Sequence, residues 1–330
     1  ALVEPSNAEL AAKLGLATHA KLPYYDLIVV GGGPTGLTAA LYGAREGLEV
    51  LVIERSALGG QAGVTERLDN FPGFPDGIGG AEFADRLAHQ AQRFGVETLQ
   101  AQEVVGIRAE SESRYVCTAD GAEYGACAVL IATGSTYRRL GIPGEDELIG
   151  AGIHYCATCD GPFYRGKEVA VIGGGNSAAE ESIFLTRFVK KVTILVRGET
   201  MTASKVVVEK LRENSAVEIR YHTELTALHG EGKLTGVTIR DTHSGAEERI
   251  APSGLFVFIG LTPNSAMAPD RMERDGRGFI ITNPMLETNV PGIFAAGDVR
   301  LGSTKQAASA VGEGATAALM IRQYLQGMDM

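Results

Sequence analysis

Two stretches of this sequence share one arrangement of apolar and polar positions. In the first, residues 27–30 form a continuous apolar run rich in β-branched side chains, and residues 35–46 then place apolar side chains at helical spacing. In the second, a predicted strand at 168–172, apolar after its first residue, leads through a helical stretch to an apolar run at 192–196. Continuous apolar runs are typical of strands buried on both faces of a parallel sheet, and strands that alternate with helices are typical of α/β folds. The pattern predicts an α/β protein with two Rossmann-like units.

The first apolar run ends in a glycine-rich turn. Gly31, Gly33 and Gly36 give the pattern G-x-G-x-x-G where the strand passes into the helix. Glycines at this spacing allow a tight turn and a close approach of the backbone to a pyrophosphate at the helix N-terminus. Glu54 ends the next strand, 23 residues after Gly31, where a carboxylate can bind a ribose 2′-hydroxyl. The combination predicts dinucleotide binding, with a plain βαβ turn as the alternative.

The second apolar run ends in a related turn, G-x-G-x-x-A, formed by Gly173, Gly175 and Ala178. Arg197 now takes the place of the acid, 24 residues after Gly173. An acid there would repel a 2′-phosphate, whereas an arginine would pair with it. The first turn therefore suits FAD or NAD and the second suits NADP, unless Arg197 is only a solvated charge at a strand end.

The C-terminal part supports a flavin enzyme that takes hydride from a nicotinamide. Residues 289–300 form an apolar strand that closes on Gly297 and Asp298, and this Asp could bind a ribityl or phosphate-bridge hydroxyl of a flavin. The alternative is an accidental Gly-Asp turn. Residues 130–135 and 255–264 are predicted to be matched crossing strands, which would make the second nucleotide fold an insertion in the first.

A Cys-x-x-Cys pair, Cys156 and Cys159, lies directly before the second nucleotide strand. Such a pair closes a small ring that can form and break reversibly, with a redox poise that depends on thiolate stability. Asp160 follows at once and could pass a proton when a thiolate forms or leaves. The pattern favours redox chemistry.

A zinc site and an inert pair are the alternative interpretations of these cysteines. Four zinc ligands usually require a second Cys or His pair. Cys117 and Cys127 lie ten residues apart, without that spacing, and His154 is the one imidazole near the pair in sequence. Cys117 and Cys127 are themselves predicted to be small buried residues of strands.

Composition limits the partners and the compartment. The chain of 330 residues has a formal charge of −10, which argues against nucleic acid as a main partner. No apolar run reaches the roughly 18 residues of a membrane span. Residues 1–22 contain charges and no apolar signal core, so we expect a leader outside the fold and a cytoplasmic protein.

Several motifs together resemble the low-molecular-weight, bacterial-type thioredoxin reductases, class II of the pyridine nucleotide-disulfide oxidoreductases. In chain order they are GGGPTGLTAALYGARE, GGQ, ATGS, CATCDG, VIGGGNSA, FVFIGLTPN and GIFAAGDV, and the resemblance covers about residues 24–327. The succession of CATCDG and GGGNSA is the specific feature, since glycine turns alone occur in many families.

This resemblance implies a path for electrons, from NADPH to FAD, to the disulfide of Cys156 and Cys159, and then to thioredoxin. It implies that Cys159 is the thiol nearest the flavin and that Cys156 attacks the partner's disulfide. It also implies a homodimer in which the inserted domain rotates between two poses. The resemblance gives four segments: a leader at 1–22, FAD-binding parts at 23–136 and 263–330, and an inserted NADPH-binding domain at 137–262.

The resemblance also implies two sets of binding residues. Those expected to bind FAD are Gly31, Gly33, Pro34, Gly36, Glu54, Gly59, Gln61, Asn70, Thr133, Gly134, Asp298, Lys305, Gln306 and Ala307. Those expected to bind NADPH are Gly173, Gly175, Asn176, Ser177, Ala178, Arg197 and Lys205.

The chain departs from the family pattern at two places. Lys305 stands where the family has an arginine, which keeps the charge but loses the fork geometry. The family motif for the 2′-phosphate is His-Arg-Arg with a further arginine, but this chain has Val196, Arg197, Gly198 and Thr202. We therefore expect a preference for NADPH that is weaker than usual for the family.

Other functions remain open at this stage. The flavoprotein subunit of an alkyl-hydroperoxide reductase shares these motifs but adds a thioredoxin-like domain ahead of them. Ferredoxin–NADP reductases of related sequence lack the Cys pair. FAD-dependent thiol oxidases, reductases of another thioredoxin-like protein, and a non-catalytic redox sensor all stay compatible with the sequence.

Overall fold

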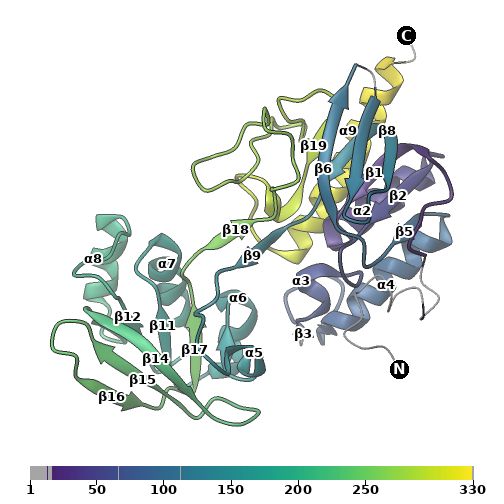
Figure 1. Cartoon of the computed structure of the whole chain (residues 1–330). Helices are drawn as coiled ribbons and strands as arrows, with labels where there is room; N and C mark the ends of the chain where they lie inside the picture. Colours follow the sequence, from purple (N-terminus) through teal and green to yellow (C-terminus); the bar gives the residue numbers. More distant parts are fainter. Residues whose placement is uncertain (1–12, 14–16, 66, 112, 329–330) are drawn as a thin grey trace. The chain divides into compact units, whose positions relative to one another are not determined.

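The computed structural model describes residues 13, 17–65, 67–111 and 113–328. Within them the chain divides into two compact units. The first unit joins the described residues up to Thr136 with those from Thr262 onward, and the second comprises Tyr137–Leu261. Figure 1 shows the elements of each unit.

The first unit is built on a mixed sheet. Its strands follow the order β5-β2-β1-β8-β7-β6, with β19 also paired to β8. The strands are β1 (Tyr24–Val30), β2 (Val50–Ile53), β5 (Glu97–Leu99), β6 (Val104–Glu110), β7 (Ser113–Thr118), β8 (Glu123–Ile131) and β19 (Ile293–Ala295). The pairs of β1, β2, β5, β8 and β19 are parallel, whereas β6–β7 and β7–β8 are antiparallel.

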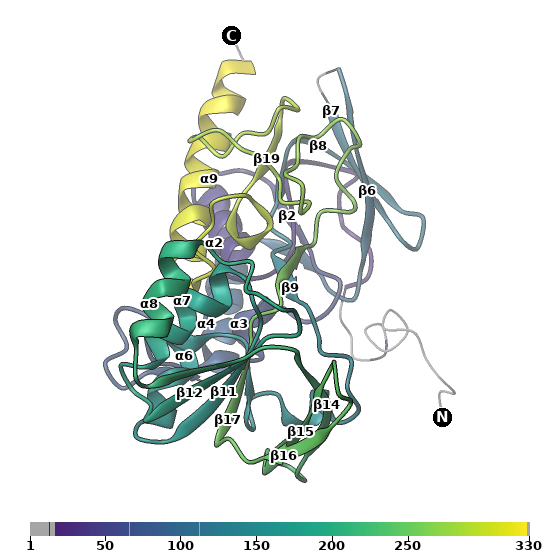
Figure 2. The same ribbon diagram turned by 90° about the vertical axis from the view of Figure 1, so that its left-hand side faces the viewer.

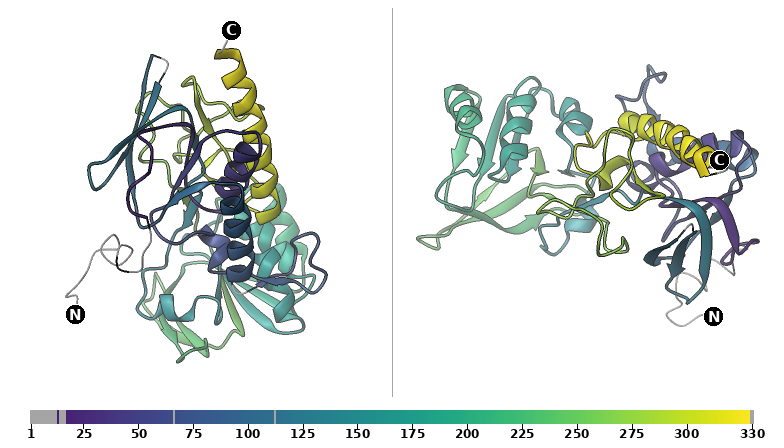
Figure 3. Two further views of the ribbon diagram at one scale, coloured as in Figure 1. Left: turned by 90° about the vertical axis from the view of Figure 1, so that its right-hand side faces the viewer. Right: turned by 90° about the horizontal axis from the view of Figure 1, so that it is seen from above.

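Both faces of this sheet are covered, which is why residues 27–30 of its central strand β1 are all apolar. Leu27 and Val29 pack in a cluster with residues of the helices, whereas Ile28 and Val30 belong to a second cluster on the other face. The helices are α2 (Pro34–Arg45), α3 (Gly60–Gly63), α4 (Gly80–Arg93) and α9 (Ala307–Met328), and a small hairpin pairs β3 (Arg67–Leu68) with β4 (Ile78–Gly79). Helices α2 and α9 lie side by side (Figure 3).

The second unit has a parallel sheet in the order β10-β17-β11-β12-β13. Its strands are β10 (Ile153–His154), β11 (Glu168–Ile172), β12 (Lys191–Leu195), β13 (Val217–Arg220) and β17 (Gly254–Val257). The remaining elements are α5 (Glu145–Leu148), α6 (Ala157–Asp160), η1 (Gly161–Tyr164), α7 (Asn176–Leu185), α8 (Lys205–Glu213) and an antiparallel sheet of β14 (Thr223–His229), β15 (Gly236–Asp241) and β16 (Glu247–Ile250).

The parallel sheet of the second unit is also buried on both faces. Val169 and Val171 pack with residues of α7 and α8, whereas Ala170 packs with Val237 and Ile239 of the antiparallel sheet. Figure 2 shows α7 and α8 together beside β11 and β12. The α/β fold class predicted from the apolar runs is confirmed.

Two short strands, β9 (Ser135–Tyr137) and β18 (Leu261–Pro263), pair with each other where the chain passes between the units. The crossing strands are shorter than the segments 130–135 and 255–264 that the sequence predicted. Gly134 and Gly260 have positive φ angles of 66° and 114°, and they separate β9 and β18 from the strands β8 and β17. The long apolar parts of both predicted segments belong to the two sheets instead.

The leader expected at 1–22 lies mostly outside the described residues. Two of its last residues, Ala20 and Lys21, form hydrogen bonds with the first unit. The backbone N–H of Ala20 donates to the hydroxyl of Tyr124 (3.2 Å), and that of Lys21 donates to Glu97 Oε1 (2.8 Å). Among the described residues, no helix is both long enough and apolar enough to cross a membrane.

Candidate functional site

The first glycine turn joins β1 to α2. Gly31 has φ = +107°, and a Cβ there would lie 2.5 Å from the carbonyl oxygen of Ala132. A Cβ on Gly36 would lie 1.9 Å from the carbonyl oxygen of Gly31, so the helix can approach the strand only because this residue is glycine.

Gly33 is different, because a Cβ there would have no neighbour closer than 3.9 Å. It is the N-cap of α2, Pro34 follows as the first helical residue, and no described side chain caps the helix. The open space and the uncapped N–H groups form a cradle that fits the pyrophosphate of a dinucleotide such as FAD.

Glu54 ties this turn to the end of β2. Its carboxylate is 8% exposed; Oε2 accepts from the backbone N–H of Gly32 (2.8 Å), and Oε1 accepts from both the N–H and the hydroxyl of Ser56 (2.9 Å each). A carboxylate can accept about four hydrogen bonds. One position therefore remains, on Oε2, for the ribose hydroxyl that the sequence predicts.

Gly59 and Asn70 are brought to this site from segments that follow β2. The N–H of Gly59 donates to the carbonyl of Gly32 (2.8 Å), which places α3 and its exposed Gln61 beside the glycine turn. Asn70 Nδ2 donates to Gln306 Oε1 (3.0 Å), although 236 residues separate them.

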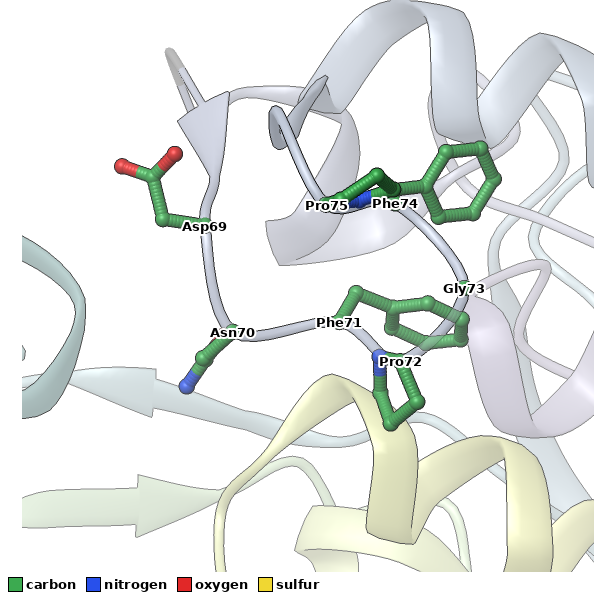
Figure 4. Close-up of a pocket in the computed structure, with 7 residues that line it drawn as sticks. All are labelled: Asp69, Asn70, Phe71, Pro72, Gly73, Phe74 and Pro75. Atoms are coloured by element: carbon green, nitrogen blue, oxygen red, sulfur yellow. The ribbon is translucent and has the colours of Figure 1, made fainter.

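Asn70 belongs to a loop, 69–75, that lines a surface pocket (Figure 4). The ring of Phe71 packs on Phe83 of α4, with centroids 4.5 Å apart, and this contact holds the loop against the unit. The hydrogen bond to Gln306 thus joins the loop to the segment that enters α9 at Ala307.

The Gly-Asp turn, η2 (Gly297–Val299), lies against the first turn of α2. A Cβ on Gly297 would be 2.3 Å from Thr35 Oγ1. Asp298 accepts from the hydroxyl of Ser303 (2.9 Å), and Lys305 Nζ donates to the backbone carbonyl of Asp298 (2.7 Å). Burial raises the pKa of Asp298 and lowers the pKa of Lys305, and their attraction offsets part of each change.

Sequence reasoning missed two residues that hold this turn. Glu313 of α9 accepts from the N–H of Gly297 (2.7 Å) and forms a two-pronged pair with Arg300, with Nε–Oε2 and Nη2–Oε1 distances of 2.8 Å. A signal was present, because Glu313 is the one charged residue in the first half of α9.

A third missed residue, Asn264, fixes the predicted pair Thr133 and Gly134. The hydroxyl of Thr133 donates to the Asn264 carbonyl, and Asn264 Nδ2 donates back to the Thr133 carbonyl (2.8 Å). The N–H of Asn264 also donates to the Gly134 carbonyl (3.0 Å).

The second glycine turn, in the other unit, repeats this construction. A Cβ on Gly173 (φ = +144°) would lie 2.4 Å from the Phe258 carbonyl oxygen and 2.9 Å from the Cβ of Ala178, whereas a Cβ on Gly175 would have no neighbour closer than 3.9 Å. Asn176 Oδ1 accepts from the N–H of Ser204 (2.7 Å), so residues 202–204 form a wall beside the turn. Gly175 caps α7 without help from any side chain in the described part of the chain.

Arg197 and Lys205 are both exposed near this turn. Arg197 lies just after β12, and Lys205 is the first residue of α8. Neither side chain makes a hydrogen bond or ion pair to another described residue, so both charges are available to an anionic ligand. Ser177, the remaining polar residue of the predicted set, is exposed on α7.

Cys156 and Cys159 are bonded to each other at the start of α6, with Cα atoms 5.3 Å apart. Cys156 is the N-cap of this short helix, and its Sγ accepts from the N–H of Cys159 (3.1 Å). Cys117 and Cys127 are free thiols on β7 and β8. They are half-buried rather than buried as predicted: Cys117 occupies one of the more exposed alternate positions of β7, and Cys127 is the one partly exposed residue within β8.

Asp160, the last residue of α6, faces a buried imidazole. Its Oδ2 lies 3.3 Å from His154 Nδ1, and His154 Nε2 lies 2.7 Å from the hydroxyl of Tyr164. The proposed proton carrier therefore lies at one end of a chain of polar groups that runs through His154 to Tyr164.

Comparisons with known proteins agree with this geometry. Residues 25–314 match the family described as pyridine nucleotide-disulphide oxidoreductase. The chain is 42% identical to a thioredoxin reductase of Treponema pallidum (92% of this chain, 98% of the relative) and 40% identical to one of Bacillus subtilis (92% and 96%). The chain belongs to the thioredoxin reductase family. A solved thioredoxin reductase from Streptococcus pyogenes has a TM-score of 0.88 at 39% identity, covering 92% of this chain and 99% of that one.

Membership of the thioredoxin reductases confirms the family that the motifs indicated. It implies a flavin and a nicotinamide cofactor, and the two glycine turns supply one open cradle in each unit. The predicted FAD residues gather around the first cradle and the predicted NADPH residues around the second, but their individual roles stay predictions.

Proposed function

We propose that this protein is an NADPH-dependent thioredoxin reductase with FAD as its flavin. The observation that carries the proposal is the bonded Cys156–Cys159 pair, which lies in the same unit as a second dinucleotide cradle. A bound flavin would accept hydride from the nicotinamide and supply two electrons to the disulfide.

The first unit would hold FAD through its own groups. The N–H groups of α2 and the open space at Gly33 suit the pyrophosphate, and Glu54 suits the ribose. Asp298 would bind a hydroxyl of the flavin chain, on a turn that Arg300 and Glu313 keep in place.

The second unit would hold NADPH in a similar way. Gly175 and the N-terminus of α7 suit the pyrophosphate, and Arg197 and Lys205 supply positive charge for the 2′-phosphate. Asn176 holds the neighbouring wall at Ser204.

The cysteine pair would carry electrons onward by thiol–disulfide exchange. Once reduced, Cys156 attacks a disulfide of thioredoxin, and Cys159 then displaces the partner by re-forming the ring. Asp160 would exchange a proton with the pair as thiolates form and leave.

A rotation of the second unit would let the nicotinamide and the disulfide take turns at the flavin. The proposal is supported by the fact that both groups belong to that unit and that it connects to the first through the paired strands β9 and β18. We further propose a homodimer, which the family resemblance implies. We also propose a cytoplasmic location, because free thiols such as Cys117 and Cys127 persist in reducing compartments.

The direct test is oxidation of NADPH by the FAD-loaded protein with and without oxidised thioredoxin. Turnover that depends on thioredoxin would support the proposal. Rapid oxidation that requires oxygen and ignores thioredoxin would instead indicate a thiol oxidase. A third outcome is that NADPH reduces the flavin and the protein turns over with another thioredoxin-like protein but not with thioredoxin. The proposed reaction would then stand, and only the proposed partner would be replaced.

The nucleotide preference gives a second prediction. Replacing Arg197 with alanine should raise the KM for NADPH about tenfold, because one charge-assisted contact contributes about 1.5–3 kcal/mol and 1.4 kcal/mol is tenfold in affinity. The KM for NADH should change less than about twofold, since NADH lacks the 2′-phosphate. Steady-state kinetics with both nucleotides measure this.

Arg249→Ala, on the exposed strand β16 of the same unit, is the matched control and should leave both KM values unchanged. Equal loss of affinity for NADH and NADPH in Arg197→Ala would show that Arg197 does not recognise the phosphate. A wild-type kcat/KM for NADH that equals the value for NADPH would overturn the assignment of NADPH.

A further inference from the structure

His154 connects the predicted proton carrier to a buried tyrosine. Its ring is 6% exposed, and the ring of Tyr164 is 9% exposed. Nδ1 lies 3.3 Å from Asp160 Oδ2 and Nε2 lies 2.7 Å from the Tyr164 hydroxyl. When Asp160 is ionised and the imidazole is neutral, the carboxylate can only accept, so the Nδ1–H tautomer would face Asp160 and the Tyr164 hydroxyl would donate to Nε2.

The same three groups can also satisfy a protonated Asp160. Its O–H would then donate to Nδ1, and the imidazole, as its other tautomer, would donate Nε2–H to the oxygen of Tyr164. His154 therefore remains a partner of Asp160 before and after the carboxyl group gives up a proton. An apolar residue at this place could serve neither state, and a lysine could serve only one.

The ring is fixed in this position by its neighbours. His154 ends β10, opposite Phe256 of β17, and its centroid lies 5.3 Å from the Phe256 ring and 5.3 Å from the Tyr164 ring. The imidazole is therefore well packed, and its Nδ1 edge faces Asp160, the residue that follows Cys159 in the chain.

We propose that His154 is a positioning residue that holds Asp160 ready to exchange a proton with the Cys156–Cys159 pair. This inference rests on the proposed function. A bound reduced flavin would supply the two electrons that break the Sγ–Sγ bond; one sulfur would then leave as a thiolate and the other would take the proton of the Asp160 carboxyl group. Asp160 becomes a carboxylate that accepts from Nδ1–H, and reoxidation by thioredoxin reverses the transfer.

Other charged groups lie around this chain. The ammonium of Lys167 is 5.5 Å from the centroid of the Tyr164 ring. Helix α7 packs against α6 and carries Glu180 and Glu181, and burial raises the pKa of Glu181. Tyr155, which follows His154 in the chain, forms hydrogen bonds with Glu145 and Arg139 rather than with this group of residues. Because several ionisable groups are nearby, a pH dependence of cysteine reactivity can be assigned to Asp160 only by substituting that residue.

The test uses the FAD-loaded protein, reduced with dithiothreitol and freed of excess reductant. The rate of alkylation of Cys156 and Cys159 by iodoacetamide is measured by mass spectrometry across about pH 5–9. The inflection due to Asp160 is the one that Asp160→Asn lacks. In His154→Phe that inflection should move upward, because the ionised carboxyl group would lose the N–H that faces it.

His89→Phe, an exposed histidine of α4, is the matched control and should leave the profile unchanged. Tyr164→Phe should move the same inflection by less, and it keeps the test possible where His154→Phe fails to fold. In the Asp160→Asn background, His154→Phe should add no further change to the profile.

The inference would be overturned if the inflection were unchanged in both His154→Phe and Tyr164→Phe. It would also be overturned if His154→Phe changed the profile equally in the wild-type and Asp160→Asn backgrounds. In either case His154 would be a packing residue. An alkylation profile without any inflection due to Asp160 would overturn it too. Failure of the proposed function is a separate result, since it would appear as absent thioredoxin-dependent turnover in the wild-type protein.

Discussion

Replacing Cys159 with serine is expected to lower thioredoxin-dependent turnover by at least about 1,000-fold, because a covalent redox step loses one of its two sulfurs. The structure bonds Cys159 to Cys156, and among the described residues it offers no third thiol on α6 or η1 to take its place. FAD binding should be unchanged, because the predicted FAD residues all belong to the first unit. Turnover is followed by NADPH oxidation, and flavin reduction by stopped-flow absorbance under anaerobic conditions.

Two controls separate this effect from damage to the fold. Cys127→Ser, a free half-buried thiol of β8, should keep nearly all turnover. Cys156→Ser should also lose turnover, but it retains the thiol that is predicted to lie nearest the flavin. Retention of thioredoxin reduction in Cys159→Ser would mean that electrons bypass this pair, and the proposed mechanism would then be wrong.

The fold class was predictable because the strongest signals were local. Residues 27–30 are apolar at every position, and the structure buries all four, with alternate side chains in clusters on opposite faces of the sheet. Gly31 and Gly173 both adopt positive φ, as expected for tight turns that only glycine makes easily. In each case the spacing of residues in the sequence was enough to predict the local backbone structure.

The partners of the supporting residues were not predictable because they lie far away in the chain. Asn264 binds Thr133 across 131 residues, and neither apolar periodicity nor a local motif indicates such a pair. Glu313 binds Gly297 across 16 residues, from a helix to a turn. His154 lay close to the cysteine motif, but its role required knowing that β10 places the ring against Asp160.

The second large effect concerns two glycines of the same turn. Gly36→Ala should destabilise the first unit by about 3 kcal/mol, because the new Cβ would lie 1.9 Å from the Gly31 carbonyl oxygen and backbone must move. Gly33→Ala should leave the apoprotein within about 0.5 kcal/mol of the wild type, since φ = −78° suits alanine and the nearest atom is 3.9 Å away. It should nevertheless weaken FAD binding at least about tenfold, because its methyl group would occupy the space that the pyrophosphate needs.

Chemical denaturation of the apoproteins and flavin titration followed by fluorescence measure the two effects separately. Gly175→Ala is the matched control in the second unit, where the open position is equivalent and the nearest atom is again 3.9 Å away. It should leave FAD affinity unchanged and raise the KM for NADPH. If Gly33→Ala bound FAD as tightly as the wild type, the pyrophosphate could not lie against this turn. The first unit would then have to hold its flavin elsewhere.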